Sequence, residues 1–167
     1  MSIWGGITGG LLGFVVLGPI GALVGSVIGS NISSRSKRRR PNNFDQQVAF
    51  FAALFACLAK IAKADGRVDE TEIKKIEEII SSKLNLNKEH RNFAINIFQK
   101  AKDDDVSFEA YASNLYQVLS SSPNSLLVFY EMLFELALAD GILHPNEDAL
   151  LKKIPRIFRF DEKVYKS

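Results

Sequence analysis

Two short acidic segments carry the residue types in this chain that could do chemistry. Residues 64–72 read Ala-Asp-Gly-Arg-Val-Asp-Glu-Thr-Glu, and residues 139–147 read Ala-Asp-Gly-Ile-Leu-His-Pro-Asn-Glu. Both follow one pattern, in which Ala-Asp-Gly is followed by any residue, an aliphatic residue, three further residues and a glutamate. Oxygen and imidazole ligands of this kind suit a divalent cation. The six candidate metal ligands are Asp65, Asp69, Glu72, Asp140, His144 and Glu147.

A structural role explains the same residues without a metal. Asp65 and Asp140 follow long apolar runs typical of helices, and the helix dipole disfavours a carboxylate at a helix C-terminus. Each can offset this by accepting hydrogen bonds from backbone amides of its own turn, while Asp69 and the two glutamates cap the helices that follow. The spacing lacks the glycine-bearing loop of an EF-hand. We therefore expect turn caps and no cofactor, with a divalent cation as the alternative.

The rest of the sequence predicts no catalytic site. It shows no nucleophile paired with a base, no glycine-rich phosphate loop and no Cys/His metal cluster. The single cysteine, Cys57, lies in an apolar run, cannot form an internal disulfide and is expected to be a small core residue. We therefore expect a protein that is not an enzyme.

The elements that must position the acidic segments are helices. Two apolar runs, residues 48–64 and 126–139, each precede an Ala-Asp-Gly turn and then an amphipathic helix. Asn87 and Ser107 predict two further helix starts by capping, and Pro123 suits the first turn of another. No alternating strand pattern occurs. Residues 44–167 therefore predict an all-α bundle of six to seven helices with an internal pseudo-two-fold repeat and the two apolar helices buried at its centre.

The N-terminal 34 residues carry no charged side chain. This apolar stretch exceeds the roughly 20 residues that a membrane helix needs, so residues 1–34 predict a single transmembrane helix, in which Pro19 offers a bend. A helical hairpin folded at residues 18–21 is an alternative. A cleaved signal peptide fits poorly, because no Lys or Arg precedes the apolar part and that part is too long.

Glycines recur at intervals of four residues within this stretch, and Leu17 is the one break in the series. On a helix they form one stripe, along which a second backbone can approach closely. The stripe predicts a homodimer through the membrane helix, unless the glycines only reflect their general frequency in membrane spans. The stripe consists of Gly5, Gly9, Gly13, Gly21, Gly25 and Gly29.

A basic cluster follows the apolar stretch within the linker, residues 35–43. Its cations are Arg35, Lys37, Arg38, Arg39 and Arg40. Cations beside a span are retained in the cytoplasm and attract anionic lipid headgroups, so the N-terminus is expected outside and the domain in the cytoplasm. The remaining chain holds sixteen Lys and Arg against nineteen Asp and Glu. This mildly acidic domain is not expected to bind nucleic acid.

The paired Ala-Asp-Gly turns, each behind an apolar helix, resemble the TerB-like domain of tellurite-resistance proteins. A glycine-rich span directly before such a domain further resembles the N-terminal part of DjlA-type co-chaperones of the bacterial inner membrane. In that family a J-domain follows, which acts through a His-Pro-Asp tripeptide. Here His144-Pro145-Asn146 lacks the Asp and belongs to the second turn, so the resemblance implies an anchor and TerB-like domain without a J-domain. Residues 161–165 look like the opening of a further helix, as in an N-terminal fragment of a longer chain.

Three functions follow as hypotheses. The first is a membrane-anchored interaction or scaffold module that faces the cytoplasm and presents its helical domain to a protein partner. The second is a metal- or oxyanion-responsive domain of the tellurite-resistance type, with the acidic turns as its working part. The third is a structural subunit of a larger membrane assembly.

Overall fold

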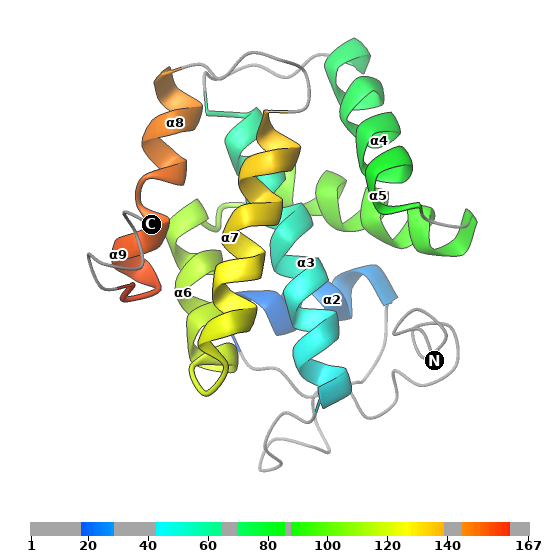
Figure 1. Ribbon diagram of the computed structural model, residues 1–167. Coiled ribbons are helices and arrows are strands. Elements are labelled where there is room, and N and C mark those ends of the chain that lie inside the picture. The colour runs from blue at the N-terminus through cyan, green and yellow to red at the C-terminus, as the bar shows by residue number, and fades with distance from the viewer. Residues whose placement is uncertain (1–17, 29–42, 65–69, 86–87, 139–144, 161–167) are drawn as a thin grey trace.

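The computed structural model describes residues 18–28, 43–64, 70–85, 88–138 and 145–160 (Figure 1). Helices are the regular secondary structure of these residues, and no strand occurs among them, which confirms the predicted all-α class. In chain order the helices are α2 (Pro19–Ile28), α3 (Asn43–Ala62), α4 (Glu70–Leu84), α5 (Lys88–Asp103), α6 (Phe108–Leu119), α7 (Pro123–Ala137), α8 (Pro145–Leu151) and α9 (Ile154–Ile157).

Helix α3 is the centre of the domain. Every residue from 52 to 59 is buried, with Phe55 and Leu54 among the largest fully buried side chains. Helices α2, α5, α6, α7 and α8 all contact α3. A helix that is apolar all round is stable in water only when other helices cover it on every side. The four alanines among residues 52–59 keep it slim enough for that close packing.

Helix α7 is less buried than its apolar sequence predicts. Phe129 and Leu133 are fully buried, but Val128 is 46% exposed and Glu131 and Glu135 face solvent. The expectation of two central buried helices is therefore wrong for α7, which covers one side of α3. The aromatic side chains of its partly covered side pack instead on the C-terminal segment, because the rings of Tyr130 and Phe160 lie 6.0 Å apart.

The helix boundaries keep the register of the internal repeat. Helix α3 ends at Ala62 and α7 at Ala137, whereas α4 begins at Glu70 and α8 at Pro145, so the equivalent boundaries are 75 residues apart in both cases. Helices α3 and α7 run side by side with their C-termini at the same end, the top of Figure 1. The two helix–turn–helix copies therefore keep the same spacing across their turns.

The second helix of each copy packs on the first helix of the other. Helix α4 contacts α7, and α8 contacts α3, while α4 and α8 lie on opposite sides of the domain in Figure 1. This reciprocal packing buries Ile73 of α4 and Leu151 of α8 in the shared core. The two copies are thus held together as one unit.

Two of the predicted helix starts are confirmed. The hydroxyl of Ser107 accepts a hydrogen bond from the amide of Ala110 at 3.0 Å and so caps α6. Pro123 occupies the first turn of α7, where its missing N–H costs no hydrogen bond. The predicted caps Asp69 and Asn87 lie outside the described residues.

Of the helices that the structure describes, none combines the length and the apolarity required to cross a bilayer. Most of the predicted anchor and linker lies outside the described residues. That part includes Gly5, Gly9, Gly13, Gly29, Arg35, Lys37, Arg38, Arg39 and Arg40.

Candidate functional site

Helix α2 packs against α3, α5 and α6, and we call the face that these three helices present to it the groove. Its buried side chains are Ile20, Leu23 and Val24, of which Ile20 and Val24 are fully buried. Positions i, i+3 and i+4 lie on one face of a helix, so a single apolar face of α2 fills the groove. The sequence predicts one continuous helix through this segment. In the structure the helix instead begins at Pro19, which occupies its first turn rather than a bend.

The start of α2 is capped by a residue from another helix. The carbonyl of Gly18 accepts the hydrogen bond of Ala22 at 3.1 Å, so Gly18 holds the N-cap position but has no side chain to offer. Asn114 of α6 supplies the missing acceptor, because its Oδ1 accepts from the amide of Ile20 at 2.8 Å. Asn114 is the buried polar residue of the described core, 8% exposed. A cap across 94 residues of sequence thus fixes where α2 begins.

Gly18 and Asn114 fit each other so closely that a side chain at position 18 would displace Asn114. The φ angle of Gly18 is +91°, a conformation that other residues rarely adopt. A Cβ atom on Gly18 would lie 2.8 Å from Oδ1 of Asn114, which is closer than real Cβ contacts. Gly25 differs, because a Cβ there meets nothing within 4 Å. Gly18, just before α2, and Gly25, within it, therefore differ in their tolerance for a side chain.

One carboxylate, Asp104, joins the three helices that form the groove. Its Oδ1 accepts from Nζ of Lys60 on α3 at 2.7 Å and from the amide of Val106 at 2.9 Å, and its Oδ2 accepts from the hydroxyl of Tyr111 on α6. The Lys60 and Asp104 side chains are 12% and 27% exposed. We call Lys60, Asp104, Val106 and Tyr111 the Asp104 clamp. It ties α3, the end of α5 and α6 together independently of α2.

Burial sets the protonation of two groups beside this clamp. Tyr111 is 1% exposed, and burial, reinforced by its hydrogen bond to Asp104, raises the pKa of its hydroxyl well above the usual range. Burial alone raises the pKa of the Cys57 thiol far above its usual value. Both groups therefore stay neutral at physiological pH. Cys57 behaves as the small core residue that the sequence predicts, because a thiol that does not ionise is unreactive.

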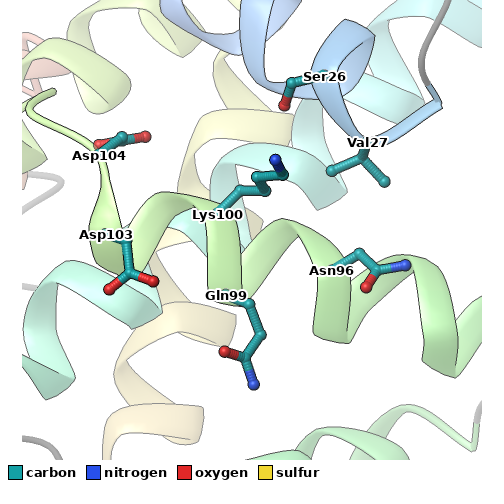
Figure 2. A pocket seen from close by; sticks show the side chains of 7 residues that line it. All are labelled: Ser26, Val27, Asn96, Gln99, Lys100, Asp103 and Asp104. Carbon is teal, nitrogen blue, oxygen red and sulfur yellow. The ribbon is translucent and has the colours of Figure 1, made fainter.

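An open cleft of about 640 Å³ lies between α2 and the C-terminal half of α5. Figure 2 shows Lys100 extending towards α2, where Ser26 and Val27 form the opposite wall, whereas Gln99 points away and binds Glu77 of α4 at 3.2 Å. The carboxylate of Asp104 is already engaged by the clamp. No nucleophile paired with a general base occurs among the described residues that line this cleft. They are Ser26, Val27, Asn96, Gln99, Lys100, Asp103 and Asp104.

Most of the predicted metal ligands lie outside the described residues. This holds for Asp65, Asp69, Asp140 and His144, and for Glu72 the structure describes only the helical backbone of α4. Glu147 lies in the first turn of α8 and is partly exposed. Within the described part of the chain, no group of three or more His, Cys, Asp or Glu side chains could hold a metal ion.

Asn114 and Asp104 are the functional residues that the sequence reasoning missed. Asn114 lies on the same face of α6 as the apolar residues Tyr111 and Leu115, which are buried. A lone polar residue on a buried face needs a hydrogen-bond partner, and this could have been noticed in the sequence. Asp104 stands in a run of three aspartates that reads as a solvated loop. Only the fold distinguishes the central one, since Asp103 and Asp105 are exposed.

Comparison with known proteins gives two family matches in tandem. Residues 51–167 match the model of the tellurite resistance protein TerB, and residues 1–39 match that of the co-chaperone DjlA transmembrane domain. The two matches confirm the predicted resemblance and indicate a membrane anchor. Helix α2 lies within the residues of the second match. No solved structure matches the chain.

Several curated relatives carry the name co-chaperone protein DjlA. The chain is 33% identical to that of Photobacterium profundum (96% of this chain, 62% of the relative) and 31% identical to that of Coxiella burnetii (96% and 64%). It is 29% identical to that of Escherichia coli K12 (90% and 57%). The chain thus spans about three fifths of the length of these relatives.

Proposed function

The chain belongs to the family of the tellurite resistance protein TerB, and on that premise we propose that it is a membrane-anchored interaction module whose helical domain faces the cytoplasm. The order of the two family matches carries the proposal, because a transmembrane-domain match directly precedes the TerB match. The five cations of residues 35–40 follow the apolar part of the first match and precede the second match. Cations beside a span are retained on the cytoplasmic side, so the domain after them faces the cytoplasm.

The chemistry of the described residues favours binding over catalysis. Buried and partly buried polar side chains, those of Asn114, Tyr111, Lys60 and Asp104, hold helices to one another. Groups that satisfy each other in this way stabilise a scaffold and are not available to a substrate. The module therefore acts through its surface, as an interaction domain and not as an enzyme.

The relatives suggest the kind of work that this module does. They are named co-chaperones, so we propose that the chain brings a cytoplasmic protein to the membrane in chaperone-related work. We further propose that two chains associate through the glycine stripe of their spans. Gly25 supports this, because the space beside it is open to a second backbone.

The experiment that tests the proposal is co-purification after cross-linking in cells. The full chain carries a C-terminal tag, and the matched control is the anchor and linker alone, residues 1–42 with the same tag. We expect cytoplasmic proteins to be recovered with the full chain and not with the control. Recovery of periplasmic proteins instead, or recovery of an identical set of proteins with the full chain and with the control, contradicts the proposal.

A further inference from the structure

We propose that the groove formed by α3, α5 and α6 is a docking site for the chain's own residues 18–28, and that docking and membrane insertion are alternative states of this segment. The proposal rests on the membrane anchor of the proposed function. Residues 18–28 lie within the match to a transmembrane domain, yet the structure packs them on the water-soluble domain. The domain thereby holds part of its own anchor out of the lipid.

The two states exclude each other because the same side chains are used in both. Ile20 and Val24 are 0% exposed and Leu23 is 5% exposed in the groove, so none of them can contact lipid while α2 is docked. Leaving the groove exposes this apolar face, and either water or lipid must then receive it. Lipid accepts apolar surface at no cost, so the membrane competes directly with the groove for this one face.

The groove recognises the start of the segment as well as its apolar face. Asn114 accepts the amide of Ile20, and this requires the left-handed backbone of Gly18. A membrane-spanning helix needs neither, because in a continuous helix the amide of Ile20 bonds to a carbonyl four residues earlier. The pair Gly18 and Asn114 therefore contributes to the docked state and contributes nothing to the inserted one.

The groove remains formed when the segment leaves. Its three helices are joined by the Asp104 clamp, and Gln46 of α3 donates to the carbonyl of Val118 on α6 at 3.3 Å. None of these contacts involves α2. Residues 29–42 connect the segment to α3, and fourteen residues can span up to about 45 Å. Docking within one chain is therefore within reach of this connection.

The test compares a substitution at Gly18 with one at an exposed position of α2. Gly18→Ala introduces the Cβ that collides with Asn114 and strains φ, so it weakens docking alone. The matched control, Ser26→Ala, changes an exposed residue of α2 that is not part of the glycine stripe. The full chain is synthesised in a cell-free system with liposomes of phosphatidylethanolamine and phosphatidylglycerol, and the ratio of sedimented to soluble protein is measured.

We expect Gly18→Ala to raise the ratio of sedimented to soluble protein at least about fivefold, and Ser26→Ala to leave it within about twofold of the wild type. Asn114→Ala should raise the same ratio by about fivefold, which is the change in an equilibrium constant expected when a typical N-cap is lost. Asn114→Asp keeps the acceptor oxygen and should not raise it. Because Asn114→Ala also alters the domain, thermal unfolding is recorded for it, whereas Gly18→Ala leaves the domain sequence intact.

Cross-linking reports docking directly. Ser26→Cys on α2 and Lys100→Cys on α5 line the same cleft, and both native side chains are exposed. A flexible bis-maleimide should join them within one chain in the soluble fraction and not in liposomes, while buried Cys57 stays unreactive. Cross-links only between two chains, or equal sedimentation of all variants, would overturn the docking site. A wild type that never sediments would contradict the membrane anchor itself.

Discussion

Replacing Asp104 with alanine should destabilise the domain more than any other single change of a carboxylate among the described residues. The substitution removes an acceptor shared by Lys60, Val106 and Tyr111. A hydrogen bond to a charged group contributes about 1.5–3 kcal/mol, and a neutral one about 1 kcal/mol. These contributions are not additive, and Asp104 is 27% exposed, so water reaches the vacated site. We expect a loss of about 3 kcal/mol in the free energy of unfolding.

Two matched variants separate the clamp from a general charge effect. Tyr111→Phe removes one hydroxyl and leaves Lys60 paired, so it should cost about 1.5 kcal/mol. Asp103→Ala removes the neighbouring carboxylate, which is 70% exposed and pairs with Lys102 at 3.1 Å. An exposed ion pair contributes little, so this control should change stability by less than about 0.5 kcal/mol.

The assay is urea unfolding of the full chain in a mild detergent, followed by circular dichroism. The double variant Asp104→Ala with Tyr111→Phe completes a cycle, and we expect a coupling of about 1.5 kcal/mol between the two side chains. Equal effects of Asp103→Ala and Asp104→Ala, or a coupling near zero, would refute the assignment of Asp104 as the residue that joins the three helices.

Three further predictions concern the anchor, the acidic turns and pH. Gly21→Leu with Gly25→Leu should weaken self-association in a membrane two-hybrid assay, and unchanged association would remove the glycine-stripe argument. If Asp65 and Asp140 only cap turns, Asp→Asn at both should cost less than about 1 kcal/mol, and added divalent metal should not raise the melting temperature; a metal-dependent rise that needs both residues would favour the metal-responsive function instead. Burial raises the pKa of the Cys57 thiol, so folding favours its protonated form, and this contribution to the free energy of unfolding is complete below the unfolded pKa of about 9 and is lost as pH rises further. Cys57→Ala should therefore lose less stability than the wild type between pH 9 and 10.5, and parallel profiles of stability against pH would contradict this.

The helices could be predicted from the sequence because their signals are local. Ser107 caps α6 through an amide three residues away, and Pro123 needs only its own φ angle to start α7. The internal repeat was likewise visible as a recurring pattern, and the equivalent helix boundaries keep its spacing of 75 residues. Capping residues, proline positions and repeated patterns can be read along the sequence, so they do not depend on how the helices pack against one another.

The features that could not be predicted depend on contacts between distant residues. Asn114 caps α2 across 94 positions, and no local property of either segment requires that pairing. The glycine-rich stretch satisfies the criteria for a membrane span throughout, so its apolar face shows no preference for a groove over lipid. Asp104 and its neighbours look alike until the fold brings Lys60 and Tyr111 beside one of them. For α7, packing decided that only one side is covered.

Cysteine labelling in cells tests the central claim most directly, namely that the anchored domain faces the cytoplasm. Ser120 is exposed at the end of α6, so Ser120→Cys provides a reactive thiol, while native Cys57 is buried. A membrane-impermeant maleimide is applied to cells with a permeabilised outer membrane, before and after the inner membrane is opened. We predict that Ser120→Cys is labelled only after opening. Labelling with the inner membrane intact would place the domain on the other side and contradict the account.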